Sequence, residues 1–298
     1  MTDTAHLVAA VASKLGLSDA DRIHYIKKPR WINYSRAKQV LQKLTDLLEH
    51  PSQPRMPNML VIGETNNGKT ALVQKFLERN PADTNITGEA VKVPVLYIQA
   101  PPGPDEAGLY TAILKRLFQD FPRAESKNAR LNRVLSVLQR IDLGMIMVDE
   151  IHHLMAGSFT SSRNCLNVLK YLGNELQVPL VGIGTIEALR AVQTDPQLSN
   201  RFTPELLPRW KVGQPELHQL LASFEKVLPL RKPSGLESDA LAEQIVHMCD
   251  GTIGEMSTLV NAAAIQAIRS GSEQITAEEI ATSGYVGPAE RKLVGSQV

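Results

Sequence analysis

The sequence predicts an α/β fold in which helices cover both faces of a parallel sheet and a small all-helical domain follows. Short apolar runs alternate with helical patterns from residue 58 to residue 184, which is typical of parallel strands joined by crossover helices. The run MIMV at 145–148 is apolar at every position, which indicates a strand buried on both faces. After Trp210 the strand signals stop and only helical patterns remain.

The elements follow in order along the chain. A helix at 34–49 has apolar residues at helical spacing and ends before three prolines at 51–57. We then expect strands at 58–63, 93–100, 143–150, 178–184 and 205–210, with helices at 70–79, 107–121, 129–141, 164–176 and 186–191. The later helices are expected at 215–227, 238–249, 254–269 and 276–282.

These patterns suggest four segments. Residues 1–55 form a basic, helical N-terminal segment, 56–212 the sheet domain and 213–283 the helical domain. The tail at 284–298 has little apolar content and is expected to be mobile.

Composition excludes several classes of protein. Two cysteines cannot cross-link 298 residues, no CxxC or HExxH spacing offers a metal site, and no apolar run is long enough for a membrane helix. The cytoplasm therefore fits best. The net charge of +1 hides two basic segments: residues 22–43 hold seven basic and no acidic residues, and residues 115–140 hold seven basic and two acidic ones.

The strongest motif is GETNNGKT at 63–70, which matches the phosphate-loop pattern at all four fixed positions. A strand leads into it and an amphipathic helix follows, so backbone N–H groups and a helix N-terminus would converge on a phosphate. Lys69 would contact the β- and γ-phosphates of ATP and the Thr70 hydroxyl would hold Mg²⁺. The alternative is a glycine-rich turn with an incidental lysine. The expected cofactor-binding residues are Gly63, Glu64, Thr65, Asn66, Asn67, Gly68, Lys69 and Thr70.

Two carboxylates, Asp149 and Glu150, follow the buried strand at 145–148. Asp149 can complete the Mg²⁺ shell, and Glu150 can polarise a water for attack on the γ-phosphate. The second carboxylate favours hydrolysis over phosphate transfer to a small molecule. The alternative is that both mark the strand end and face solvent. His152 and His153 come next, and such a pair is more often structural than catalytic.

Two further residues are candidates for the hydrolytic step. Thr185 ends the strand at 178–184, where its hydroxyl would touch the γ-phosphate or the attacking water, or would cap the next helix. Arg201 precedes the last expected strand and suits an arginine supplied to a neighbouring subunit's γ-phosphate. The alternative for Arg201 is a surface arginine, with Arg190 and Arg209 as substitutes in the catalytic role.

These motifs resemble those of the AAA+ ATPases: GETNNGKT, MIMVDE, GIGT, SNRF and a helical lid occur in the family's order over residues 56–285. The resemblance implies a P-loop AAA+ core and a helical lid domain. It also implies that Lys69 and Thr70 belong to Walker A, Asp149 and Glu150 to Walker B, and that Thr185 is sensor 1 and Arg201 the arginine finger. Many relatives carry a sensor 2 arginine at the start of the lid helix. Here Glu255 follows Gly254.

More narrowly, three segments resemble the TniB/TnsC-type ATPases of bacterial transposons: 22–44 (RIHYIKKPRWINYSRAKQVLQKL), DEIHHL at 149–154 and GTIGEMSTLVNAAA at 251–264. This resemblance implies a bacterial, cytoplasmic regulator that binds ATP and Mg²⁺ and oligomerises on double-stranded DNA as a ring or filament. It would recruit a DDE-type transposase and link it to a TniQ-type target-selection protein. Alternatives are a helicase-loader or replication-initiator ATPase, or a scaffold that binds ATP without turnover. A phosphotransferase fits poorly, because few arginines follow Trp210.

The basic segments are the expected DNA contacts, because lysine and arginine pair with phosphates without base readout. In the first segment, the alternative is that Trp31 packs on the ATPase core and the lysines are merely solvated. Residues at the start of an AAA+ core often line the adenine site, so the resemblance also makes Ile26 and Trp31 nucleotide contacts. The expected DNA-binding residues are Lys27, Lys28, Arg30, Lys115, Arg116, Lys127, Arg130 and Arg133.

Overall fold

The computed structural model describes residues 4–83, 91–122, 124–194 and 199–295. These residues form two compact units. The sheet unit consists of Gln39–Thr65 and Lys69–Leu207, and the helical unit consists of Met1–Lys38, Asn66–Gly68 and Pro208–Val298. The N-terminal residues therefore divide at Lys38, and not at the prolines near residue 55.

The sheet unit contains five parallel strands: β1 (Asn58–Gly63), β2 (Val95–Gln99), β3 (Met145–Asp149), β4 (Leu180–Gly184) and β5 (Phe202–Leu207). Their order is β2-β3-β4-β1-β5, so β4 lies between the strands that carry the two main motifs. The last strand begins three residues earlier than expected, because Phe202 already pairs with Asn58. Pro204 is tolerated there because β5 is an edge strand.

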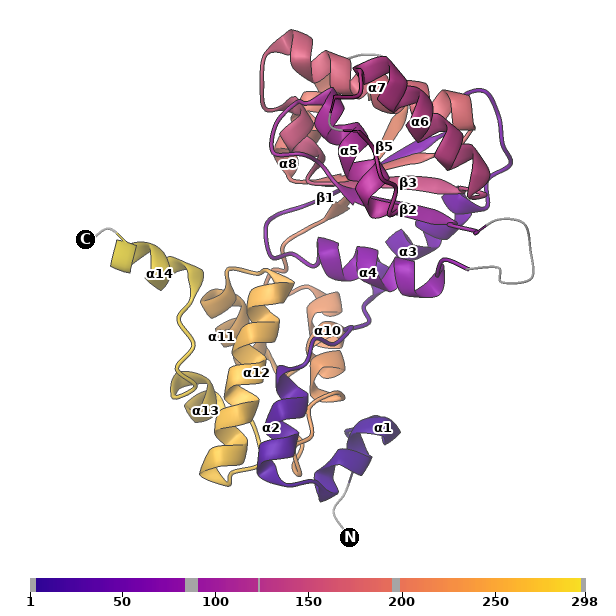
Figure 1. Cartoon of the computed structure of the whole chain (residues 1–298). Coiled ribbons are helices and arrows are strands. Elements are labelled where there is room, and N and C mark those ends of the chain that lie inside the picture. The colour runs from indigo at the N-terminus through magenta and orange to yellow at the C-terminus, as the bar shows by residue number, and fades with distance from the viewer. Residues whose placement is uncertain (1–3, 84–90, 123, 195–198, 296–298) are drawn as a thin grey trace. The chain divides into compact units, whose positions relative to one another are not determined.

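Helices cover both faces of this sheet (Figure 1). The helices α5 (Glu106–Arg116), α6 (Lys127–Arg140) and α7 (Phe159–Leu176) lie on one face, and α3 (Ser35–Leu48) and α4 (Lys69–Arg79) lie on the other. The short helix η2 (Ile151–Met155) follows β3, and α8 (Ile186–Thr194) follows β4. Helix α5 ends five residues before its expected end at 121, because Phe118 adopts a left-handed backbone with φ of 53°.

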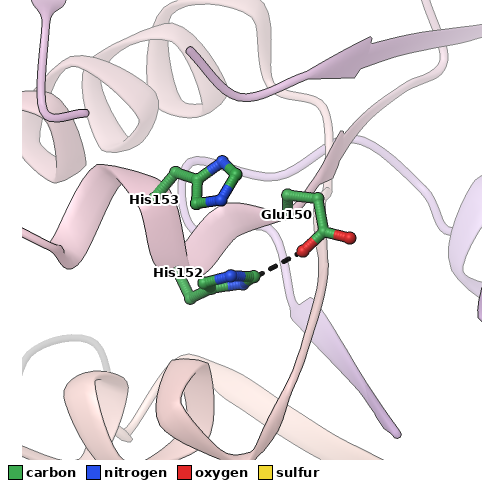
Figure 2. Close-up of side chains that lie close together, drawn as sticks. All are labelled: Glu150, His152 and His153. Atoms are coloured by element: carbon green, nitrogen blue, oxygen red, sulfur yellow. Dashed lines mark ion pairs between the residues drawn. The ribbon is translucent and has the colours of Figure 1, made fainter. Parts of the chain in front are cut away.

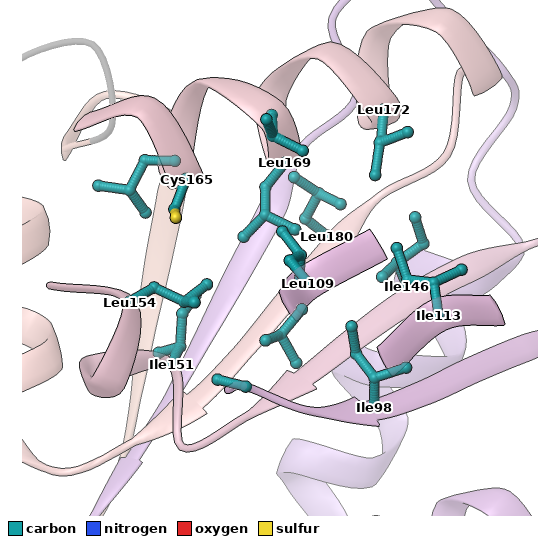
Figure 3. Packing of buried hydrophobic residues seen from close by; sticks show 14 of the residues in the cluster. Ile98, Leu109, Ile113, Ile146, Ile151, Leu154, Cys165, Leu169, Leu172 and Leu180 are labelled. Atoms are coloured by element: carbon teal, nitrogen blue, oxygen red, sulfur yellow. The ribbon is translucent and has the colours of Figure 1, made fainter. Parts of the chain in front are cut away.

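The core of the sheet unit lies between the strands and helices α5, α6 and α7 (Figure 3). Ile98 and Ile146 project from neighbouring strands toward Leu109 and Ile113 of α5, and Leu169 and Leu172 of α7 complete the layer. All six side chains are almost completely buried. This packing fixes the carboxyl ends of the strands, from which the candidate site residues extend.

The helical unit combines residues from both ends of the chain. Its elements are α1 (Ala9–Ala12), η1 (Ser13–Gly16), α2 (Asp19–Lys27), α10 (Pro215–Glu225), α11 (Asp239–Cys249), α12 (Ile253–Ser270), α13 (Ala277–Ala281) and α14 (Pro288–Gly295). Ile26 of α2 lies in one buried cluster with apolar residues of α10, α11 and α12. The part of the tail at 288–295 forms a helix where a mobile segment was expected.

A buried ion pair joins the N-terminal and C-terminal parts of the helical unit. The guanidinium of Arg22, which has no exposed surface, donates to both carboxylate oxygens of Glu273 at 2.6 and 2.7 Å. Burial acts to raise the pKa of Glu273, but the hydrogen bond and charge of Arg22 outweigh it and lower the pKa. Arg22 therefore does not belong to a solvent-facing basic surface.

None of the helices formed by the described residues combines the length and apolar content that crossing a lipid bilayer requires.

Candidate functional site

The phosphate-loop motif connects β1 to α4. Strand β1 ends at Gly63, the loop follows, and α4 begins at Lys69. Gly68 has φ of 82°, a left-handed conformation that glycine adopts without strain. A Cβ atom at Gly68 would lie 3.0 Å from Ile253 Cγ2, so a larger residue would also require the Ile253 side chain to shift. At Gly68 no side chain stands between the backbone and a bound phosphate, as close approach requires.

The side chain of Lys69 folds back onto this loop. Its Nζ donates to the carbonyl oxygens of Gly63 and Glu64 at 2.9 and 2.8 Å. Burial lowers the pKa of Lys69, whereas Glu150, Asp149 and Glu64 act to raise it. The charges of Asp149, which ends β3, and of Glu150, which follows it, thus act on this ammonium. Thr70, the next residue, is exposed at the start of α4.

The carboxylate of Asp149 is held at the end of β3. It is 6% exposed, and its two oxygens accept hydrogen bonds from Tyr97 Oη at 2.6 Å and from the Glu150 backbone N–H at 2.8 Å. Burial, together with the bond to Asp149, raises the pKa of Tyr97 above its ordinary value. Asp149 therefore does not face solvent. Sequence reasoning missed Tyr97, because its position beside Asp149 depends on the pairing of β2 with β3.

Glu150 has an unusual backbone conformation, with φ of 51° and ψ of 39°. Its Oε2 lies 3.2 Å from Nδ1 of His152, and His153 lies beside both (Figure 2). The carboxylate is partly exposed, with 34% of the side-chain surface accessible. Glu150 is therefore more accessible to water than the neighbouring Asp149.

The carboxyl ends of three neighbouring strands bring the main candidates to one edge of the sheet. Gly63, Asp149 and Gly184 end β1, β3 and β4, which are adjacent in the sheet. Thr185 follows Gly184, and its hydroxyl hydrogen-bonds to Glu187, which lowers the pKa of that carboxyl. The hydroxyl of Thr185 thus serves its own helix here, and a contact with phosphate stays a prediction.

Arg201 lies at the opposite edge of the sheet. It precedes β5, its carbonyl accepts from the Asn58 N–H at 3.1 Å, and its guanidinium donates to Asn174 at 3.3 Å. It lines a small cavity with Lys170 and the first residues of β1 and β4. Because parallel strands place their amino ends at one edge and carboxyl ends at the other, Arg201 is separated from its own phosphate loop by the length of the strands. Of the two substitutes, Arg190 is exposed on α8 and Arg209 pairs with Asp250.

The helical unit contains the tip of the phosphate loop. Asn66 donates from Nδ2 to Glu255 at 2.9 Å, and its carbonyl accepts from the Gly254 N–H at 2.9 Å. Glu255 also accepts from Tyr285 at 2.7 Å and pairs with Arg291 of α14 at 2.5 Å. Glu255 therefore anchors the tip of the loop. Sequence reasoning marked Glu255 only as a departure from the family pattern, and no local signal indicated Arg291.

The expected adenine contacts also lie in the helical unit. Ile26 is completely buried in its core, and Trp31 is partly exposed. Tyr34 packs edge-to-face on Trp210 with ring centroids 5.4 Å apart, and burial raises the pKa of Tyr34 to about 12. Contacts of Ile26 and Trp31 with adenine stay predictions.

The expected DNA contacts fall in both units. Lys27 and Lys28 are exposed, but Arg30 is half-buried and donates to Asn261 at 2.5 Å. In the sheet unit, Lys115 and Arg116 are exposed at the end of α5. The α6 cations have acidic partners: Lys127 lies 3.7 Å from Glu106, Arg130 lies 3.8 Å from Glu125, and Arg133 lies 3.0 Å from Glu125. Four of the eight expected DNA contacts are therefore exposed and lie outside these contacts: Lys27, Lys28, Lys115 and Arg116.

The family model described as "Bacterial TniB protein" matches residues 22–212, which is more than half of the chain. The chain belongs to the TniB family. No curated protein sequence matches this TniB-family chain.

Solved structures that resemble this TniB-family protein share its fold. The ORC2 protein of Aeropyrum pernix superposes with a TM-score of 0.61 at 16% identity, over 87% of this chain and 70% of that chain. The ORC1 protein of the same organism, solved in complex with DNA, superposes with a TM-score of 0.56 at 19% identity, over 87% of this chain and 68% of that chain. The RuvB branch migration motor of Thermotoga maritima superposes with a TM-score of 0.52 at 12% identity, over 87% of this chain and 72% of that chain. The predicted P-loop AAA+ fold with a helical C-terminal region is confirmed.

Proposed function

We propose that this TniB-family protein is a Mg²⁺-dependent ATPase that hydrolyses ATP to ADP and phosphate. The observation that carries the proposal is the meeting of three features at one sheet edge. These are the phosphate loop with its buried lysine, the ordered carboxylate of Asp149 and the accessible carboxylate of Glu150. No member of this set is needed to stabilise a sheet edge, since polar loop residues alone would suffice there. Their combination suits phosphoryl chemistry.

The residues present fit ATP and Mg²⁺. The loop offers backbone N–H groups with Gly68 in a left-handed conformation, and Lys69 supplies a cation beside it. The Thr70 hydroxyl and the Asp149 carboxylate are hard oxygen donors, which Mg²⁺ prefers. Bound Mg²⁺ would neutralise charge on the β- and γ-phosphates. Lys69 would exchange its two carbonyl contacts for phosphate oxygens, which are stronger acceptors for an ammonium group.

Glu150 is the group that would activate water. Its carboxylate would accept a proton from the water that attacks the γ-phosphate, and to do so it must turn from His152 toward the phosphate. Asp149 stays in place through Tyr97, so the two neighbouring carboxylates have separate tasks. Thr185, next to the same edge, would exchange Glu187 for the attacking water or the γ-phosphate.

Hydrolysis would require a second copy of the chain. Arg201 lies at the amino edge of the sheet, away from the phosphate loop of its own subunit. Supplied to a neighbouring subunit, its guanidinium would stabilise charge on the γ-phosphate in the transition state. Turnover would then depend on assembly into a ring or filament.

Within the TniB family, the proposed role of this assembly is to regulate transposition on double-stranded DNA. The assembly would link a DDE-type transposase to a TniQ-type target-selection protein. Among the exposed cations, Lys27, Lys28, Lys115 and Arg116 are the ones that would pair with DNA phosphates. Family membership favours this role over a helicase loader or replication initiator, because the likeness to ORC proteins at 16–19% identity extends only to the fold.

The substitution Glu150→Gln separates binding from turnover. We expect the variant to bind a fluorescent ATP analogue with Mg²⁺ as the unchanged protein does, while phosphate release falls at least about a hundredfold. Glu78→Gln, a change on the exposed side of α4, is the matched control and should keep the full rate. Equal turnover of Glu150→Gln and the unchanged protein would refute the role of Glu150. If neither the unchanged protein nor the two variants released phosphate in the presence of DNA, the non-hydrolysing scaffold would be favoured.

A further inference from the structure

Three side chains that follow β3 face one another: Glu150, His152 and His153 (Figure 2). Each offers one ligand atom, and the three atoms lie within 4.8 Å of one another. The two imidazole rings have centroids 4.5 Å apart with planes at 61°, so they do not stack face to face. One carboxylate and two imidazoles are a ligand set typical of zinc.

The backbone builds this arrangement. Glu150 adopts a left-handed conformation and leads into the 3₁₀-helix Ile151–Met155, and the His153 N–H donates to the Glu150 carbonyl at 2.9 Å. A 3₁₀-helix has three residues per turn, so residues 150 and 153 lie on the same side. Such a backbone is unfavourable at a non-glycine residue and tends to persist at functional sites. The cluster is therefore fixed by the turn.

The Nδ1 atoms of the two histidines have no hydrogen-bond partner among the residues that the structure describes. Nδ1 of His152 and Nδ1 of His153 are both buried and accept or donate no hydrogen bond, although the former lies 3.2 Å from the Glu150 carboxylate. A buried polar atom without a hydrogen bond destabilises the folded protein. A purely structural role for the two rings leaves this cost unexplained, whereas a ligand that binds both nitrogens would remove it.

We propose that Glu150, His152 and His153 bind one divalent transition-metal ion of the Zn²⁺ class, and that the bound ion inhibits ATP hydrolysis. Three atoms no more than 4.8 Å apart lie within about 2.8 Å of a common point. Zinc–nitrogen distances are about 2.0–2.1 Å, so each ligand needs to move by less than about 1 Å. A fourth position would be left for water.

The inhibition follows from the shared carboxylate and rests on the proposed function. A Glu150 carboxylate bound to a metal ion cannot accept a proton from the attacking water. Mg²⁺ would not compete strongly for this site, because it prefers oxygen ligands. Lys69, Asp149 and Glu187 are charged groups near the cluster, and because the two carboxylates outnumber the one ammonium, their net charge favours a bound cation.

Binding can be tested without nucleotide by titrating the full chain with Co²⁺, a spectroscopic substitute for Zn²⁺. We expect a visible d–d absorption band that saturates at one Co²⁺ per chain and is displaced by Zn²⁺. His152→Ala and His153→Ala should each weaken the affinity at least about tenfold. His247→Ala, at an exposed position on α11, is the matched control. Equal Co²⁺ affinity in all of these variants, or no saturable band, would overturn the inference.

Inhibition is tested by phosphate release at saturating Mg²⁺ with buffered free Zn²⁺. We expect the rate to fall at least about tenfold and to return on chelation, while His153→Ala keeps its own metal-free rate at the same Zn²⁺ concentration. Turnover that Zn²⁺ leaves unchanged would refute inhibition. Histidine-dependent Co²⁺ binding in a protein that never hydrolyses ATP would refute the proposed function and leave the metal site standing.

Discussion

Asn66, at the tip of the phosphate loop, donates a hydrogen bond from its side-chain amide to Glu255 at 2.9 Å. The same carboxylate accepts from Tyr285 and Arg291. Burial acts to raise the pKa of Glu255, but the bonds from Arg291, Tyr285 and Asn66 outweigh it and lower the pKa. An ionised glutamate thus orders the loop from the position where many AAA+ relatives carry an arginine.

Removing this anchor should weaken ATP binding. In Glu255→Ala the tip of the loop loses its acceptor, so ordering the loop must be driven by the nucleotide. We expect the Kd for a fluorescent ATP analogue to rise about tenfold, since one hydrogen bond to a charged group contributes about 1.5–3 kcal/mol. Glu278→Ala, an exposed change on α13, should bind as the unchanged protein does. An unaltered Kd in Glu255→Ala would show that the loop is ordered without Glu255.

Tyr97→Phe should weaken the response to Mg²⁺. The change removes the hydrogen bond that orients Asp149 while keeping the aromatic ring. Loss of such an orienting partner typically costs about tenfold or more in metal affinity. We therefore expect half-maximal phosphate release to require about ten times more Mg²⁺. Tyr171→Phe, at an exposed position on α7, controls for the loss of a tyrosine hydroxyl. If phosphate release depended on Mg²⁺ in the same way in Tyr97→Phe and Tyr171→Phe, Tyr97 would have no role in positioning Asp149.

Breaking the pair of Arg22 and Glu273 should destabilise the helical unit. Glu273→Gln leaves the buried guanidinium without its charged partner, and we expect the free energy of unfolding at pH 7 to fall by about 3 kcal/mol. Chemical denaturation measures this, with the exposed Glu243→Gln on α11 as control. A loss no larger than in the control would refute a stabilising role.

The same pair should make stability depend on pH. The folded-state pKa of Glu273 is lowered from 4.5, so its contribution is complete above that value and is lost as the pH falls through the lower, folded pKa. The difference in stability between the unchanged protein and Glu273→Gln should therefore shrink as the pH falls below 4.5. A constant difference down to the acid transition would contradict this sign.

Mixed subunits should test whether Arg201 acts on a neighbouring subunit. Arg201→Ala and Glu150→Gln should each be inactive alone, because each damages every site in a uniform assembly. In an equal mixture, about a quarter of interfaces pair an intact Glu150 with an intact Arg201, so about a quarter of the wild-type rate should return. Arg190→Ala, an exposed change on α8, should be active alone. A mixture without activity would remove support for the shared site.

Local patterns were sufficient to predict the parallel sheet and the positions of the phosphate loop and the carboxylates after β3. The periodicity of each segment and the fixed motif spacing contain that information. The order of the strands is decided by pairing between segments that are distant in the sequence. The contact of Tyr97 with Asp149 depends on the pairing of β2 with β3 and could not be predicted from local patterns. Arg22 was counted in a basic surface segment, yet it is buried against Glu273, 251 residues away. Helix α14 was missed for the same reason, because Arg291 has its partner in α12.

In the proposed function, the phosphate loop binds ATP through Lys69. This role of Lys69 is tested most directly by equilibrium binding of ATP with Mg²⁺ to Lys69→Ala, compared with Lys75→Ala at a partly exposed position of the same helix. We expect Lys75→Ala to bind as the unchanged protein does and Lys69→Ala to lose at least about a hundredfold in affinity, because a charge-assisted contact with the phosphates disappears. Equal ATP affinity of Lys69→Ala and Lys75→Ala would contradict binding of ATP through Lys69.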